Sequence, residues 1–77
     1  MANKRRLAII KYLKSRRQAT VGDIAEAIRL SFKATSKHLA LLKAVDIVES
    51  EQKSKLVFYS LAAELPRVAK SVINYIS

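Results

Sequence analysis

The stretch from residue 31 to residue 43, SFKATSKHLALLK, has two unlike faces when it is arranged as a helix. At about 100° per residue, the side chains that a core can bury share one face: Phe32, Thr35, Leu39 and Leu42. The opposite face is small, hydroxylated and cationic, without an acidic residue: Lys33, Ser36, Lys37 and Ala40. Such a helix fits the major groove of DNA, where bulk obstructs entry and phosphate repels carboxylates. The alternative is an ordinary amphipathic helix whose lysines lie in solvent.

The composition predicts one small domain that spans residues 1–77. A chain of 77 residues, 51% of them hydrophobic, can build a single core. Cysteine is absent, which excludes disulfides, thiolate metal sites and cysteine nucleophiles. No apolar run approaches the roughly 18 residues that span a bilayer, and no secretory signal is recognisable. We therefore expect a cytoplasmic protein without membrane contact.

The charge is strongly positive and unevenly distributed. A net charge of +9 is typical of a domain with an anionic partner, which is nucleic acid or, less often, an acidic membrane surface. Residues 1–17 contain no acidic side chain, whereas three of the six acidic residues lie within 45–52. This segregation favours a positioned partner over charges that only promote solubility. From the N-terminal cluster we assign three residues to the predicted DNA contacts: Lys4, Arg5 and Lys11.

The hydrophobic periodicity predicts four helices, over about residues 4–15, 20–28, 31–44 and 65–77. Thr20 and Asp23 have the spacing of a capping box, and Ser31 can cap the third helix. Between the third and fourth helices the period changes. The β-branched and aromatic segments Ile47–Ser50 and Leu56–Leu61 predict a β-hairpin, connected by the polar residues 51–55.

This order of elements resembles the winged helix-turn-helix transcription regulators, most closely the ArsR-like group. The resemblance covers roughly residues 7–61 and is carried by TVGDIAEAIRLS (20–31), KHLALLKAVDIVES (37–50) and KLVFYSL (55–61). It implies a small α+β fold with three helices, a two-stranded β-hairpin wing and a C-terminal helix. It also implies a regulator that binds double-stranded DNA, usually as a homodimer.

The resemblance places a recognition helix, residues 31–44, in the major groove and a wing, residues 51–55, on the backbone or the minor groove. The implied contacts of the recognition helix are Ser31, Lys33, Ala34, Ser36, Lys37 and His38. The chemistry of the side chains agrees, because lysine binds phosphate or guanine and serine bonds to phosphate or a base edge. Small residues allow close approach and can touch a thymine methyl group, which adds Ala40. In the wing, Lys53 and Lys55 add counterion release.

The chain departs from the family pattern at several positions. Metal-sensing members carry a Cys-x-Cys pair where this chain has Thr20-Val21-Gly22, so we expect no metal site and no cofactor. The sole histidine, His38, cannot build such a site alone. Asp46 replaces a usual glycine and has to enter the left-handed region of backbone conformation. The wing also lacks its usual glycine, and Thr35 stands where an aliphatic residue is commoner.

Catalysis and base stacking are the weaker interpretations. No nucleophile, base and orienting group share a suggestive spacing, and one glycine cannot form a phosphate-binding loop, so an enzyme is not predicted. Five aromatic residues could stack on bases, but the core is the commoner place for them, and Phe32 and Phe58 fit a core well. The five are Tyr12, Phe32, Phe58, Tyr59 and Tyr75.

The predicted last helix carries a wide apolar stripe within residues 63–77, formed by Leu65, Val68, Val72, Ile73 and Ile76. The stripe can pack on the domain's own core, or it can pair two chains about a two-fold axis. Because the first helix also offers an apolar face, we favour a homodimer. Its recognition helices would lie about 34 Å apart, one turn of DNA.

We therefore predict a sequence-specific regulator of transcription that acts as a repressor by occluding a promoter. Two alternatives stay open. One is an architectural protein that coats DNA with low sequence preference, and the other is a winged-helix module that binds proteins rather than DNA.

Overall fold

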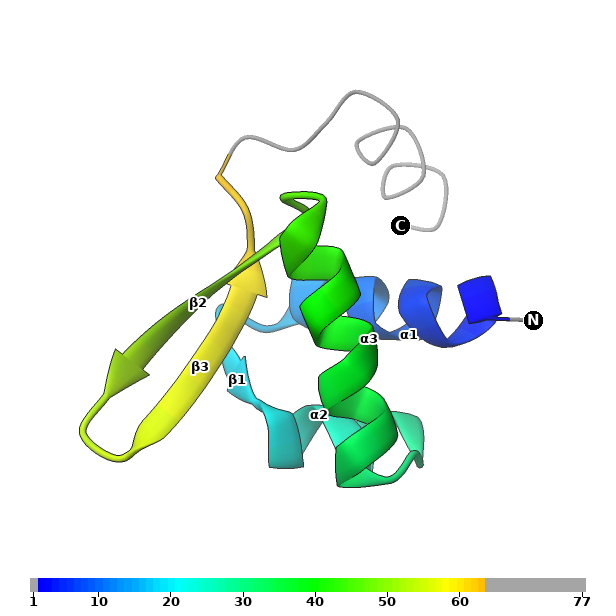
Figure 1. Ribbon diagram of the computed structural model, residues 1–77, viewed down its shortest axis with the longest axis horizontal. Helices are drawn as coiled ribbons and strands as arrows, with labels where there is room; N and C mark the ends of the chain where they lie inside the picture. The colour runs from blue at the N-terminus through cyan, green and yellow to red at the C-terminus, as the bar shows by residue number, and fades with distance from the viewer. Residues whose placement is uncertain (1, 64–77) are drawn as a thin grey trace.

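The computed structural model describes residues 2–63 of the chain (Figure 1). Its elements in chain order are α1 (Ala2–Ser15), β1 (Ala19–Thr20), α2 (Val21–Ile28), α3 (Phe32–Ala44), β2 (Val48–Lys53) and β3 (Leu56–Leu61). The three helices and the β-hairpin confirm the predicted α+β winged helix-turn-helix fold. The predicted last helix and the dimer-interface stripe lie outside the described residues.

The sheet has a third strand that the sequence analysis did not predict. β1 pairs with β3 in antiparallel orientation, with Ala19 opposite Tyr59 and Thr20 opposite Phe58, so the strand order is β1-β3-β2. A strand of two residues has no alternation for a periodicity argument to detect, and its partner lies far along the chain. The paired strand buries Ala19 in the core.

Side chains and left-handed residues define the ends of α2 and α3 as the sequence predicted. The amide of Asp23 donates to Oγ1 of Thr20 at 3.2 Å, and the amide of Thr20 donates to Oδ2 of Asp23 at 3.5 Å. This reciprocal pair is the capping box. Helix α2 ends at Arg29, which has a left-handed φ of 57°. Helix α3 begins where the Oγ of Ser31 accepts the amide of Ala34 at 3.1 Å.

A short turn joins α3 to the wing. Asp46 has a φ of 62°, which confirms that this residue adopts the left-handed conformation for which the family usually has glycine. The amide of Asp46 donates to the carbonyl of Lys43 at 3.1 Å, and the amide of Ile47 donates to the carbonyl of Leu42 at 2.9 Å. These bonds satisfy carbonyl groups at the helix end and direct the chain at once into β2.

The wing is more regular than the sequence predicted. β2 continues through Lys53, and Lys53 pairs with Leu56, so only Ser54 and Lys55 form the turn. The prediction of a five-residue connection over 51–55 was wrong, because a polar strand edge resembles a loop in composition. Ser54 has a φ of 59° in place of the usual glycine. On β3 the residues Tyr59 and Leu61, two positions apart on one face of the strand, pack against the core.

The core lies between the helices and the sheet, and its fully buried side chains come from five elements: Ile9, Ile10, Leu13, Ala19, Ile24, Leu39, Leu42 and Val48. Thr35 is also fully buried on α3. Phe32 is not in the core, although the helical wheel places it near Leu39, because 63% of its surface is exposed. A wheel gives the direction of a side chain but not the length of helix that the core covers, and α3 extends past the core at its first turn.

Candidate nucleic-acid interface

One face of α3 is exposed, cationic and free of acidic residues. Opposite the buried Thr35, Leu39 and Leu42, the side chains of Lys33, Lys37 and Ala40 are exposed. Neither lysine has a hydrogen-bond or ion-pair partner among residues 2–63, so both ammonium groups are available to an anion. Helix α3 lies at the front of the molecule with α1 crossing behind it (Figure 1). The exposed face is therefore an accessible ridge.

Other predicted contact residues on α3 lie at the border of this face. Ser31 is exposed, and although its Oγ already accepts the amide of Ala34, its O–H can still donate to a phosphate. Ala34, Ser36 and His38 are half-buried. The Nδ1 of His38 is buried and has no hydrogen-bond partner in the described part of the chain. Lys33, Lys37 and Ala40 thus share the exposed face of α3, while Ser36 and His38 lie on its two opposite flanks.

The side of α3 next to Ser36 is joined to the wing. The Nζ of Lys43 donates to the Oγ of Ser50 on β2 at 2.6 Å. Residue 50 was not among the predicted site residues, because nothing local in the sequence marks a bond between a helix and the strand after it. This contact defines which edge of α3 faces the wing.

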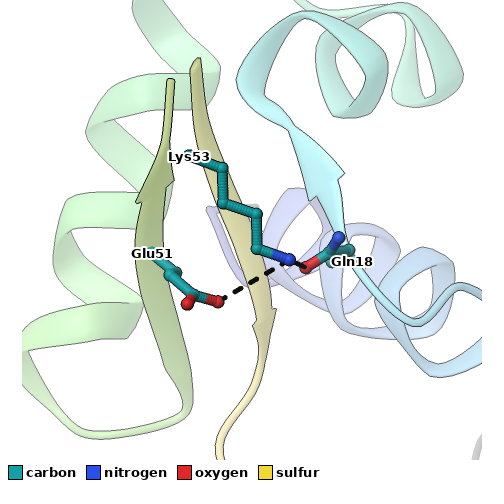
Figure 2. A network of polar contacts seen from close by, with 3 residues as sticks. All are labelled: Gln18, Glu51 and Lys53. Atoms are coloured by element: carbon teal, nitrogen blue, oxygen red, sulfur yellow. Dashed lines mark hydrogen bonds and ion pairs between the residues drawn. The ribbon is translucent and has the colours of Figure 1, made fainter. Parts of the chain in front are cut away.

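The two wing lysines have different surroundings. Lys55 lies in the turn, is exposed, and has no partner among the residues that the structure describes. Lys53 is exposed too but has partners, as Figure 2 shows: its Nζ donates to Oε1 of Gln18 at 3.2 Å and lies 3.8 Å from Oε1 of Glu51. The same Nζ lies 5.7 Å from the centroid of the Phe58 ring. Lys53 therefore already has partners in the free protein.

Strand alternation explains this difference. Successive side chains of a strand point to opposite faces, and on β2 the buried Val48 and half-buried Ser50 share the face toward α3. Glu49, Glu51 and Lys53 consequently share the outer face, away from α3. No local pattern marks Gln18 as a partner of Lys53, because the two residues are 35 positions apart.

The cationic residues predicted on α1 do not join the α3 face. Ile9, Ile10 and Leu13 turn one side of α1 into the core, and Lys4 and Lys11 lie on the opposite, exposed side of that helix. Arg5 is exposed as well. The molecule thus carries two separate cationic surfaces, one on α3 and the wing turn and another on the outer side of α1.

Within residues 2–63 no three His, Cys, Asp or Glu side chains are grouped so that they could hold a metal ion. None of the helices in that range is long and apolar enough to cross a membrane.

Comparison with known proteins agrees with this geometry. The chain is 36% identical over 63 residues to the transcriptional activator HlyU of Vibrio cholerae, covering 82% of this chain and 57% of HlyU. It is 38% identical over 42 residues to the transcriptional repressor SdpR of Bacillus subtilis, covering 54% and 47%. The chain thus spans about half the length of these curated relatives.

Solved structures show the same fold. The structure of HlyU from Vibrio cholerae superimposes with a TM-score of 0.80 at 33% identity, covering 99% of this chain and 78% of that one. The Zalpha domain of Carassius auratus PKZ, solved in complex with Z-DNA, superimposes with a TM-score of 0.71 at 22% identity, covering 78% and 95%. At that identity the second likeness shows the fold alone.

The family model of the bacterial regulatory proteins of the arsR family matches residues 3–50, which include all three helices and the start of the wing. Members of this family are DNA-binding regulators of transcription and not enzymes, which confirms the sequence-based exclusion of catalysis. The chain belongs to the arsR family of bacterial regulatory proteins.

Proposed function

We propose that this protein is a sequence-specific regulator of transcription that places α3 in the major groove of double-stranded DNA. The observation that carries the proposal is the exposed face of α3, where Lys33 and Lys37 have no partner among the described residues and no acidic side chain interrupts the face. Lysine at such positions binds phosphate or the O6 and N7 of guanine. Chromosomal DNA as the partner places the protein in the cytoplasm.

In this proposal the wing turn lies on the backbone or in the adjacent minor groove. Lys55 is its phosphate contact, because its ammonium group is exposed and has no partner in residues 2–63. Ser36 and Ser31 complete the contacts by donating to phosphate or to a base edge. Membership of the arsR family, whose named relatives regulate transcription, supports DNA as the partner.

We further propose that the regulator acts as a homodimer through the apolar stripe of residues 65–76. The support is the sequence pattern, because these residues lie outside the described part of the chain. A two-fold dimer presents two α3 helices to a pseudopalindromic site. Repression follows if such a site overlaps a promoter, although the named relatives include both an activator and a repressor.

One observation favours a second function, the coating of DNA with little sequence preference. The exposed Lys4 and Lys11 lie on the side of α1 opposite its buried face, and Arg5 is exposed as well, so phosphate can bind on more than one side of the molecule. Binding through such dispersed cations is independent of sequence and strongly weakened by salt.

Selection of binding sites from random duplexes, carried out at two salt concentrations, tests both functions. The regulator is expected to enrich a pseudopalindrome whose half-sites lie about 34 Å apart, and to retain this preference at the higher salt. Enrichment of no sequence, together with full competition by scrambled DNA, would establish the coating protein instead. A protein that binds no duplex even at low salt would refute DNA binding altogether.

A further inference from the structure

Phe32 is an exposed aromatic residue at the first position of α3. Its side chain is 63% exposed, the largest value among the exposed large hydrophobic residues of the described chain. Leaving a phenyl ring in water forgoes the favourable free energy of burial. Because the N-terminal residues of a recognition helix reach the base edges in helix-turn-helix proteins, this ring lies where base contacts are made.

The edge of α3 that carries Phe32 can be identified from its bonds. At about 100° per residue, Ser36 and Lys43 lie within about 40° of Phe32 around the helix axis. Lys43 is bonded to Ser50 of β2, so this edge faces the wing. Figure 1 shows that α3 and β2 diverge from the turn that joins them, and Phe32 belongs to the far end of α3.

The wing also carries an exposed apolar side chain. Val57 pairs with Gln52 and lies on the face of β3 that also carries Tyr59 and Leu61, which is the face toward the core. Near the wing turn Val57 is 40% exposed. Helix α3 and the wing therefore each leave one apolar side chain exposed, Phe32 and Val57.

The charged residues near Phe32 indicate which kind of ligand can cover its ring. Lys33 follows it directly, Lys37 lies about 1.4 turns further along on a neighbouring side of the helix, and α3 contains no carboxylate. A ligand that is anionic outside and offers an apolar group inside fits these neighbours. In the major groove of DNA the phosphates supply the charge, and the 5-methyl group of thymine is the apolar group that a base edge presents.

We propose that Phe32 is a specificity-determining residue that contacts the 5-methyl group of a thymine in the major groove, an inference that rests on the proposed function. The ring and the methyl group leave water together when α3 enters the groove. Cytosine, adenine and guanine offer no such group there, so the contact distinguishes thymine from them.

The test removes the methyl group alone. In the duplex obtained by site selection, each thymine is replaced in turn by deoxyuridine, which keeps every hydrogen-bonding group. The wild-type protein is expected to bind about four-fold more weakly when one particular thymine in each half-site is replaced, as for the burial of about one methyl group. The variant Phe32→Ala is expected to bind thymine and deoxyuridine duplexes equally at that position.

Leu41→Ala is the matched control, because Leu41 is an exposed apolar residue elsewhere on the same helix and should leave the thymine preference unchanged. The inference is overturned if the wild-type protein is indifferent to every methyl group, or if Phe32→Ala keeps the full preference. A free energy of unfolding in urea that is several kcal/mol lower for Phe32→Ala than for the wild-type protein would also overturn the inference. Such a loss would show that the ring is buried within the protein. If the wild-type protein binds no duplex at all, the proposed function itself has failed.

Discussion

Thr35 is a polar residue fully buried in the core, between Leu39 and Leu42 on the same face of α3. Its Oγ1 has no hydrogen-bond partner in the part of the chain that the structure describes. Burying a hydroxyl group without a partner costs about 1–3 kcal/mol in proteins. The position therefore uses the shape of threonine and gains nothing from its polarity, which accounts for the aliphatic residue that the family more commonly places there.

Replacement of Thr35 by valine is expected to raise the free energy of unfolding by about 1 kcal/mol, because the shape is kept and the unpaired hydroxyl is removed. Urea denaturation measures the change. Thr20→Val is the matched control, since its Oγ1 accepts the amide of Asp23, and losing that cap is expected to lower the free energy by about 1 kcal/mol. A loss of stability in Thr35→Val would mean that the buried hydroxyl does have a partner.

Lys37 is the cationic side chain of α3 on which the proposed phosphate contact most depends. Lys37→Ala is expected to weaken DNA binding and to reduce the slope of log K against log salt by about 0.9 per protomer, the value for one phosphate contact. Fluorescence anisotropy across a salt series measures both quantities.

The same substitution at Lys11, on the outer side of α1, serves as the control for Lys37 because it removes an equal charge. It is expected to change the slope far less. Equal effects of the two substitutions would argue for dispersed electrostatic coating rather than an α3 interface.

At the residue scale the sequence was informative where the interaction is local. Thr20, Asp23 and Ser31 could be assigned as caps because their partners lie three residues away. Phe32 was misplaced in the core because its burial depends on how far neighbouring elements extend along α3. Which of the predicted contact residues touch DNA stays a prediction, since their partner is a separate molecule.

At the scale of the elements, the two lysines of the wing differ in their availability to phosphate. Lys55 has no partner among residues 2–63, whereas Lys53 contacts Gln18 and Glu51. Lys55→Ala is expected to reduce the salt slope by about 0.9 per protomer. Lys53→Ala is expected to reduce it by less than half as much, because its ammonium group already lies beside Gln18 and Glu51 on the outer face of the sheet. Equal slopes for the two variants would show that Lys53 leaves those partners when DNA binds.

Glu51→Gln tests whether the outer face of the wing lies near the DNA. It removes the carboxylate 3.8 Å from Lys53 while keeping the shape of the side chain. Affinity for DNA is expected to increase, because a negative charge near the duplex is lost and the ammonium of Lys53 is released. An unchanged affinity would place the outer face of the wing beyond the reach of phosphate.

The elements also show which parts of the fold a sequence pattern can predict and which it cannot. Helix periodicity and the β-branched run of β3 predicted most of the fold, because each is set by burial of one face of a single element. β1 was missed because Ala19 and Thr20 are a strand only through their pairing with β3. The sequence pattern also predicts a loop at Glu51, Gln52 and Lys53, which form the end of β2, because an exposed strand end and a loop have the same polar composition.

At the scale of the whole molecule, the oligomeric state can be tested through the terminal stripe. Ile73→Asp is expected to convert a dimer to a monomer, because a carboxylate buried in an apolar interface costs several kcal/mol. Sedimentation velocity should show the mass fall by half. Ser71→Asp, which adds the same charge off the predicted stripe, should leave the dimer intact. An unchanged mass for Ile73→Asp would exclude this stripe as the interface.

The short turn between α3 and β2 has a consequence for the DNA itself. Three features of the free protein set how the wing leaves the helix. They are the two hydrogen bonds that the turn amides donate, the left-handed conformation of Asp46, and the contact between Lys43 and Ser50. When α3 and the wing keep this geometry on binding, the duplex adapts its shape to meet both contacts. We therefore expect base pairs that the protein never touches to influence affinity through their stiffness.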